Sequence, residues 1–513
     1  MTIGMHAPIL AIAVPLLGAF ALPVLAKVHR SLRDLWAIAV GAFTCAMVIT
    51  VAVQAFTSGI QVYTLGAASP TDTIASGGFP IRIMLVVDGM SAFMGLISAL
   101  VGLASLIYAF HFLKEEQGKT LAMTLFFLLW AGMLGMEYTG DMFNFFVFLE
   151  VTSIAACALV GYRTWESRPA EAAFKTMAMY TVGGLLVLLA IGILYGEHGA
   201  LNLAYLSSRI AGSQLDKIAL GLLLGGLLMK AGAVPAHMWA PDAYGEAPAQ
   251  AAIVLVANTQ ASLYGLWRVL FTLFAGALSA PAVGWLVTSL GVLTLLVAVL
   301  MAVIQTDLGR LIAYGAVSQI GYMLLGVGVG LTVLSSRPDF GLVAMQGGIF
   351  HMMNDAATIG LLFLAAGVVK RAVGTRDLRA LGGLGHDLKW TGGFFFLGAM
   401  ALAGIPPLNG FASKLLIYES SFRLSPILTA IAVLGSILLL AVFARAFQGA
   451  FLGPRLREAK PASLSMLIAM GVLAAVILAM GLVPDFFVEH LVTPAAEALW
   501  RGRDLYLAAV LGG

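Results

Sequence analysis

Charged side chains are scarce in this chain. Only 10% of its 513 residues are Asp, Glu, Lys or Arg, whereas 61% are hydrophobic. An average soluble domain has about a quarter of its residues charged. Polar stretches long enough to fold as a separate domain are also missing, since the longest are residues 57–84, 196–216 and the tail after Pro484. These shortages exclude a soluble globular protein and predict an all-α polytopic membrane protein.

Cysteine and clustered basic residues are scarce too. The two cysteines, Cys45 and Cys157, lie in apolar runs and are expected to be small buried hydrophobic residues, with no disulfide and no metal site. The net charge of +3 comes without a basic tract, which argues against a nucleic-acid partner. We find no haem, iron–sulfur or nucleotide motif, so we expect no cofactor, and any redox chemistry would belong to partner subunits. Basic residues follow the first apolar run instead of preceding it, which predicts a spanning helix and not a cleaved signal.

What the chain has in abundance is apolar windows of about 20 residues, the length that crosses a bilayer. We expect fourteen spans, with a surface helix and no fifteenth span in the tail. The windows are 8–26, 35–56, 85–112, 120–136, 142–161, 172–195, 217–234, 248–275, 281–303, 309–330, 341–370, 391–418, 425–452 and 462–482.

Lysine and arginine are distributed unevenly between the loops on the two sides of the membrane that the fourteen predicted spans define. Seventeen of the 28 fall in loops that follow odd-numbered spans, seven fall on the other side, and four lie within spans. Basic loops stay in the cytoplasm. The bias therefore predicts that the Arg376 loop is cytoplasmic, and that the Asp72 loop and both chain termini are external.

A few ionisable residues sit where lipid is expected. Glu150, Lys230 and Lys414 lie within or beside apolar runs, and His351 and Asp355 share one helical face four residues apart. Ionisable groups at membrane depth are costly and usually face the protein interior, where they serve function. The alternatives are a buried ion pair that pins helices together, a hydrogen-bonded core histidine, and, for Lys414, a side chain that reaches outward.

Other charged residues lie near the ends of spans. We expect Glu137, Asp141 and Glu419 to be solvated there, and Arg268 and Arg445 to extend their charged groups toward the membrane surface.

Both buried lysines adjoin a sequence that interrupts a helix. Lys230 precedes "AGAVPAHMWAP" and Lys414 follows "GIPPLNGFA". We expect interruptions near Ala233–Pro235 and Ile405–Pro407. Paired broken helices are typical of internal repeats with an ion path at the breaks, because irregular backbone is tolerated at that depth only within protein or beside water. Glu150 is the expected partner of Lys230, which would gain and lose a proton at the break.

These motifs resemble the antiporter-like membrane subunits of respiratory complex I, especially the D-type component of Mrp-type cation/proton antiporters and its relatives in membrane-bound hydrogenases. The resemblance rests on "VDGMSAFM", "TGDMFNFFVFLEVTSIAACALVGYR", "MKAGAVPAHMWAPDAYGEAPAQAA", "QTDLGRLIAYGAVSQIGYMLLG" and "LAGIPPLNGFASKLLIYES". It implies fourteen helices in two inverted five-helix repeats, helices 4–8 and 9–13, with helices 7 and 12 broken. The corresponding segments are 1–112, 120–275 for the first repeat, 281–452 for the second, and 453–513.

The resemblance also implies roles for residues. Glu150 and Lys230 would form a switchable ion pair, Lys414 would end the proton path, and the chain would work within a multisubunit complex of the plasma membrane. Three positions depart from the family pattern. Gln260 stands where a lysine is usual, Tyr244 replaces a histidine, and the eleventh helix carries His351, Asp355 and Ile359 where His, His and Lys are frequent. These departures favour transport of a cation other than H⁺, or a purely coupling role, over continuous proton transfer between the halves.

The resulting expectation is a proton-translocating subunit that exchanges H⁺, with Na⁺ as a candidate counter-ion, and has no catalytic activity alone. One alternative is the equivalent subunit of a hydrogenase, formate-oxidising or NADH–quinone complex. Another is a membrane enzyme that uses Glu150, Asp242, Glu246 or His237 on a lipid-linked substrate. A structural scaffold is the last.

Overall fold

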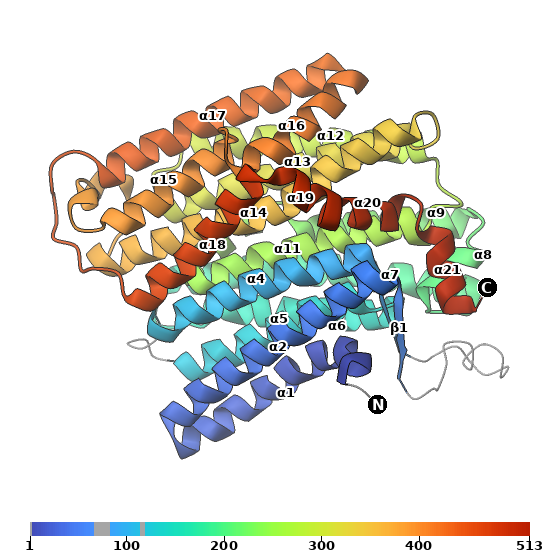
Figure 1. Ribbon diagram of the computed structural model, residues 1–513, viewed down its shortest axis with the longest axis horizontal. Helices are drawn as coiled ribbons and strands as arrows, with labels where there is room; N and C mark the ends of the chain where they lie inside the picture. Colours follow the sequence, from blue (N-terminus) through green and yellow to red (C-terminus); the bar gives the residue numbers. More distant parts are fainter. Residues whose placement is uncertain (1–2, 66–82, 113–117, 513) are drawn as a thin grey trace.

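The computed structural model describes residues 3–65, 83–112 and 118–512. Nearly all of them are helical, as the sequence predicts, and the long helices lie side by side in one bundle (Figure 1). The Asp72 loop falls outside the described residues. Both chain ends lie at the end of the bundle that carries α8 and the β-hairpin (Figure 1).

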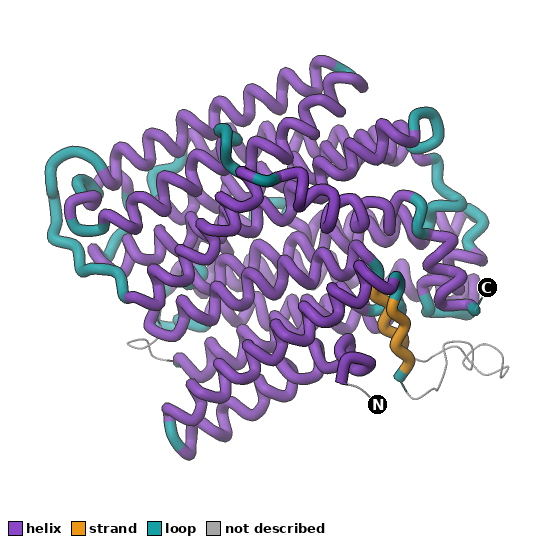
Figure 2. The backbone as a smooth tube through the Cα atoms, in the orientation of Figure 1, coloured by secondary structure: helices purple, strands orange, loops and turns teal. Residues whose placement is uncertain are grey.

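The first segment contains α1 (Ala7–Val28), α2 (Arg30–Ser58) and α4 (Gly89–Phe112), preceded by the short η1 (Ile3–His6). Between α2 and α4, β1 (Gln61–Thr64) pairs antiparallel with β2 (Met84–Val87), with Gln61 opposite Val87. Figure 2 shows this hairpin as the strand-coloured element at one end of the bundle.

The next segment holds the first half of the candidate site. Its elements are α5 (Lys119–Tyr138), α6 (Met142–Gly161), α7 (Ser167–His198), α8 (Leu203–Arg209), α9 (Gln214–Ala231), α10 (Trp239–Glu246), α11 (Ala249–Arg268) and the π-helical turn η3 (Val269–Leu273).

The second half and the tail follow. They comprise α12 (Ala280–Val303), α13 (Leu308–Val333), α14 (Pro338–Val373), η4 (Leu378–Ala380), η5 (Leu384–His386), α15 (Lys389–Ala403), α16 (Asn409–Leu424), α17 (Pro426–Phe451), α18 (Leu464–Leu482), α19 (Pro484–Phe487), η6 (Val488–Val492), α20 (Thr493–Trp500) and α21 (Arg503–Leu511). The tail thus forms short helices, none long enough to span a bilayer.

Eleven of the described helices are long and apolar enough to cross a membrane: α1, α2, α4–α7, α12–α14, α17 and α18. The three remaining predicted windows coincide with α9, α11 and the α15–α16 pair. α15 and α16 are each short because the backbone breaks between them. α11 is less apolar than the other long helices because it carries Asn, Thr, Gln and Ser residues. The chain is therefore polytopic, whereas the count of fourteen and the inverted repeats stay predictions.

Helices at the centre of the bundle are buried on all sides. Every residue of α11 is buried, as is nearly every residue of α13. Peripheral helices instead expose large apolar side chains, such as Leu17 on α1 and Ile427 on α17, and these two helices lie at opposite edges of Figure 1. Because the outer face is apolar, polar and charged side chains within the bundle are concentrated between the central helices.

Both predicted helix interruptions are confirmed. α9 ends at Ala231, Gly232 takes a left-handed φ of 75°, and the Val234–Pro235 peptide bond is cis. In the second half α15 ends at Ala403, Gly404 has φ of 82°, and the Pro406–Pro407 bond is cis. Glycine in this conformation ends a helix, and proline prevents its continuation.

Three expectations for charged residues near span ends are wrong, and two are confirmed. Glu137 and Asp141 are buried instead of solvated, and Arg268 does not reach the surface because it is buried against Asp88. Glu419 is half exposed and pairs with Arg423 at the surface. Arg445 is exposed, as expected.

Candidate proton-transfer site

Glu150 and Lys230 form an ion pair between α6 and α9. The amine Nζ lies 2.7 Å from Glu150 Oε1 and donates to Ser153 Oγ at 2.5 Å. The lysine side chain is 2% exposed and the glutamate 31%, so the amine is shielded while the carboxylate remains accessible. The sequence prediction that these residues meet is confirmed.

A glycine on α7 allows this pair to sit where it does. A β-carbon at Gly184 would lie 2.2 Å from Glu150 Oε1 and 3.4 Å from Lys230 Nζ. Any larger residue would therefore displace the carboxylate. α7 packs against both α6 and α9, so Gly184 keeps space for the pair where the three helices meet.

The carboxylate opens onto a groove of about 590 Å³ between α5, α6 and α7. Its polar lining consists of Glu150, Ser153, Tyr162, Thr164, Tyr180 and Thr181, with Cys157 beside them. The remaining lining is mostly apolar and includes exposed Ile154 and Phe174. Glu150 is thus accessible from the apolar periphery, and Lys230 lies behind it.

Aromatic side chains lie between Lys230 and the centre of the bundle. Its amine lies 5.2 Å from the centre of the Tyr180 ring, which packs edge-on against Trp239 at 4.6 Å. Tyr244 hydrogen-bonds Thr259 through its hydroxyl at 3.1 Å. His237 lies in the interruption, partly buried, and its Nδ1 atom has no hydrogen-bond partner among the described residues. The structure therefore places His237 near the break but does not join it to Lys230.

Gln260 and Asp355 connect the two halves. Gln260 Nε2, on α11, donates to Asp355 Oδ2, on α14, at 2.9 Å. Both side chains are buried. Two of the departures from the family pattern thus contact each other, which sequence spacing could not reveal because 95 residues separate them.

His351 and Lys414 form the centre of the second half. The His351 ring contacts Ser413 Oγ through Nδ1 at 2.9 Å and Gln319 Oε1 through Nε2 at 3.1 Å. Lys414 Nζ donates to the Leu402 carbonyl at 2.6 Å and to Ser436 Oγ at 3.0 Å. Lys414 is only 1% exposed, so the alternative of an outward-reaching side chain is wrong.

The interruption itself supplies the partner of Lys414. Leu402 lies in the last turn of α15, where main-chain carbonyls lack an N–H donor from the following turn of the helix. The lysine on α16 provides that donor, and its amine also lies 4.5 Å from the centre of the Tyr322 ring. No carboxylate among the described residues forms an ion pair with Lys414, unlike Lys230.

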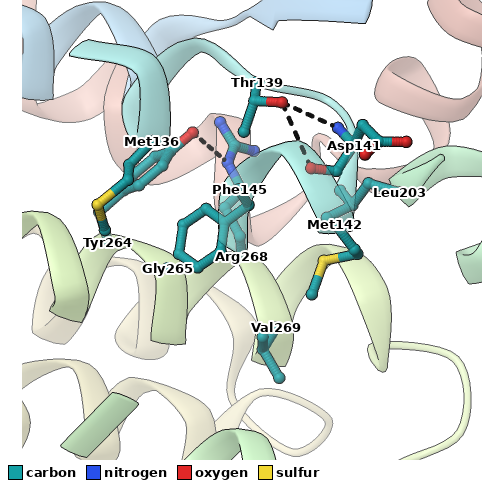
Figure 3. Close-up of a pocket in the computed structure, with 10 residues that line it drawn as sticks. All are labelled: Met136, Thr139, Asp141, Met142, Phe145, Leu203, Tyr264, Gly265, Arg268 and Val269. Atoms are coloured by element: carbon teal, nitrogen blue, oxygen red, sulfur yellow. Dashed lines mark hydrogen bonds between the residues drawn. The ribbon is translucent and has the colours of Figure 1, made fainter. Parts of the chain in front are cut away.

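The sequence analysis did not predict that Arg268 is buried in an ion pair. Arg268 pairs with Asp88 and donates to Tyr264 and Ser91, both at 3.0 Å. Figure 3 shows Arg268 and Tyr264 joined at one side of a small pocket, with Thr139 and Asp141 joined beside it. The sequence signal was Asp88, a charge inside the apolar window 85–112, although its partner lies 180 residues away.

Glu137 is a second buried acid that the sequence did not identify as a candidate. It is fully buried on α5 and accepts a hydrogen bond from Ser98 Oγ at 2.6 Å. Its other carboxylate oxygen has no hydrogen-bond partner among the described residues.

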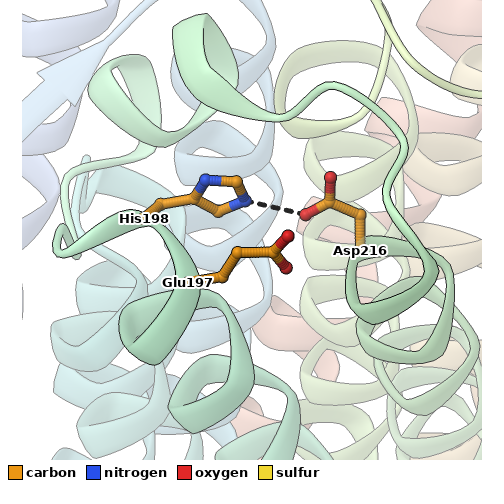
Figure 4. A group of neighbouring side chains, drawn as sticks. All are labelled: Glu197, His198 and Asp216. Atoms are coloured by element: carbon orange, nitrogen blue, oxygen red, sulfur yellow. Dashed lines mark hydrogen bonds and ion pairs between the residues drawn. The ribbon is translucent and has the colours of Figure 1, made fainter.

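One group of side chains has the composition of a metal site. The ligand atoms of Glu197, His198 and Asp216 lie within 4.8 Å of one another (Figure 4). His198 Nε2 is 2.7 Å from Asp216 Oδ1, while Asp216 Oδ2 accepts from the main-chain N–H groups of Gly212 and Ser213 at the start of α9. Asp216 therefore caps a helix, and the expectation that the chain holds no metal stays a prediction.

Comparison with known proteins agrees with this geometry. A curated N-type component of NADH-quinone oxidoreductase from Desulforudis audaxviator is 31% identical, over 97% of this chain and 99% of that protein. The D-type component of the Na(+)/H(+) antiporter from Alkalihalophilus pseudofirmus is 29% identical, over 98% of this chain and 99% of that protein. A chain in the structure of the Mrp complex from Dietzia sp. superposes with a TM-score of 0.86 at 26% identity, with both chains fully covered.

The family model described as NADH:quinone oxidoreductase/Mrp antiporter, TM, matches residues 139–439. That range includes Glu150, Lys230, Gln260, His351 and Lys414, and it amounts to more than half of the chain. Since the polytopic fold, the two interrupted helices and the buried lysines agree with this match, the chain belongs to the NADH:quinone oxidoreductase/Mrp antiporter family of membrane proteins.

Proposed function

We propose that this chain translocates protons as the antiporter-like membrane subunit of a multisubunit Mrp-type Na⁺/H⁺ antiporter in the plasma membrane. The observation that carries the proposal is the buried Lys230, held by Glu150 and Ser153 one residue before a helix interruption. A lysine so placed can change its protonation with the position of its carboxylate partner.

In this proposal the two halves have different terminal groups. Glu150 exchanges a proton with Lys230, and Lys414 ends the path at the second interruption. His351, Gln260 and Asp355 lie between them. Residues 120–275 and 281–452 are the two inverted repeats, 1–112 and 453–513 flank them, and the paired interruptions beside Lys230 and Lys414 support this division.

The basic loops also support the proposed orientation. The turn between α1 and α2 and the loops after α14 and α17 lie at the end of the bundle opposite the chain termini (Figure 2). Their lysines and arginines favour the cytoplasm, so both termini are external in this proposal.

The test is proton flux in vesicles that contain the whole complex. Lys230→Ala should abolish flux while the subunits still co-purify, because the amine's charge is used and its volume is not. Lys230→Arg should be strongly impaired, since arginine does not release its proton in proteins. Lys217→Ala, which removes an exposed lysine from the same helix, is the control. Full activity of Lys230→Arg would contradict proton cycling at this site.

A second candidate is the equivalent subunit of an NADH–quinone or hydrogenase-type complex. It is favoured by the NADH-quinone oxidoreductase relative, which aligns along almost the whole chain. Identification of the subunits that co-purify in mild detergent separates the two candidates, because only the second would bring metal-cluster subunits. The membrane-enzyme alternative gains no support, since Asp242 is bound by Lys175 at 3.0 Å and by Arg310 at 2.9 Å.

A further inference from the structure

The junction of the two halves contains two buried oxygens that no described residue hydrogen-bonds. Gln260 is 1% exposed and Asp355 is 3% exposed. One hydrogen bond joins Gln260 Nε2 to Asp355 Oδ2. Gln260 Oε1 and Asp355 Oδ1 have no hydrogen-bond partner within the part of the chain that the structure describes.

Such an arrangement is unfavourable unless a positive species joins it. A buried carboxylate without compensation is costly, and a buried amide oxygen without a donor adds to that cost. The free carboxylate oxygen and the free amide oxygen belong to two hydrogen-bonded side chains, and each can accept a proton donor or act as a ligand for a cation. Carboxylate and amide oxygens are also the ligands that hard cations prefer.

The neighbouring bases do not fill this role. Lys414, which interacts electrostatically with Asp355 from α16, is held by the Leu402 carbonyl and Ser436. His351, one turn earlier on α14, is held by Ser413 and Gln319.

The other titratable group facing Asp355 is Tyr244 on α10, whose hydroxyl is bound to Thr259. No basic side chain among the described residues forms an ion pair with Asp355 within 4.0 Å. Lys414 therefore acts on the Asp355 carboxylate only from beyond ion-pair distance, in a position where the family pattern has basic residues.

We propose that Asp355 and Gln260 form a binding site for an alkali cation, which exchanges with a proton on the Asp355 carboxylate. This inference rests on the proposed transport function and names its second substrate site. The exchange is balanced, because the carboxylate holds one proton or one cation but not both. Its position between α11 and α14 couples cation binding to the contact between the two halves.

The experiment is equilibrium binding of ²²Na⁺ to the purified whole complex over a pH series. Wild type should bind Na⁺ more weakly as the pH falls, because protons compete for the carboxylate. Asp355→Asn removes the charge and should weaken the site at least tenfold. Gln260→Lys should weaken it similarly, because a tethered ammonium would occupy the cation's position beside an intact Asp355.

Glu137→Gln is the matched control, since it removes a buried carboxylate whose hydrogen-bond donor is the Ser98 hydroxyl and not a side-chain amide. It should leave Na⁺ binding unchanged. Wild-type Na⁺ affinity in Asp355→Asn would overturn the proposal, and if Asp355→Asn does not assemble, wild-type affinity in Gln260→Lys would overturn it. Equal weakening by Glu137→Gln would also overturn it, because the effect would then be general.

Lys230→Ala separates this inference from the proposed function. Proton flux that survives Lys230→Ala contradicts the proposed proton path and leaves the Na⁺ site standing, provided that the binding result holds. Na⁺ binding that survives Asp355→Asn contradicts the site and leaves the Lys230 path intact.

Discussion

Lys414 donates to the main-chain carbonyl of Leu402 across the interruption between α15 and α16, at 2.6 Å. The break therefore supplies a hydrogen-bond acceptor to a buried amine that has no carboxylate partner among the described residues. Lys230 differs, because its amine contacts both Glu150 and Ser153. The two lysines thus occupy comparable interruptions with unlike partners.

Removing the amine of Lys414 should stop proton transfer in the second half. Lys414→Met should abolish flux and lower stability by about 1–3 kcal/mol, since the Leu402 carbonyl loses its donor. Flux in vesicles and thermal unfolding of the complex measure the two effects. Lys389→Met, which removes an exposed lysine at the start of α15, should change neither. Normal flux in Lys414→Met would remove Lys414 from the path.

Gly184 should be intolerant of even a methyl group. Gly184→Ala places a β-carbon 2.2 Å from Glu150 Oε1, so the ion pair must separate, at a cost of about 1–3 kcal/mol in overpacking. Flux should fall severely. Gly192→Ala on the same helix meets nothing within 4 Å and should be neutral or stabilising by up to about 1 kcal/mol. If both variants transport equally, the close approach of α7 is unimportant for transport.

Gln260 should be coupled energetically to Asp355 and not to Glu150. Gln260→Lys alone should be tolerated because Asp355 provides a counter-charge. Adding Asp355→Asn leaves an unpaired buried ammonium, which should cost about 3–5 kcal/mol beyond the sum of the single effects. Combining Gln260→Lys with Glu150→Gln should be additive within about 0.5 kcal/mol. Thermal unfolding of the single and double variants measures both coupling energies. Additive effects of Gln260→Lys and Asp355→Asn would contradict the prediction.

Asp88 and Arg268 should stabilise the fold. Asp88→Ala leaves Arg268 buried without its partner and should destabilise the protein by about 3–5 kcal/mol. The exposed pair Glu419 and Arg423 offers the control, since Glu419→Gln should cost less than about 1 kcal/mol. Denaturation in detergent compares the two, and equal small effects would show that the buried pair contributes little.

The topology can be tested by labelling single cysteines introduced after Cys45 and Cys157 are replaced by alanine. Arg379→Cys, in the basic loop after α14, should react only from the cytoplasm. Ser208→Cys at the end of α8 should react only from outside. Reaction of both from one side would contradict the predicted orientation of the chain.

The sequence alone determined the class of the fold and the ends of the candidate path. Scarce charge and long apolar windows predict a helical membrane protein because lipid cannot satisfy polar groups. Glycine and proline beside Lys230 and Lys414 predict the interruptions, because these residues impose local backbone conformations whatever surrounds them. The same logic singled out Glu150 as a charge inside an apolar run.

Only the tertiary structure decided which buried groups meet. Asp88 with Arg268 and Gln260 with Asp355 are joined over 180 and 95 residues of chain, and no local pattern records that proximity. Position near a span end suggested solvent for Glu137 and Arg268, but neighbouring helices cover both. Burial depends on which helices pack around a residue, and periodicity along one helix cannot reveal whether lipid, water or protein lies against it.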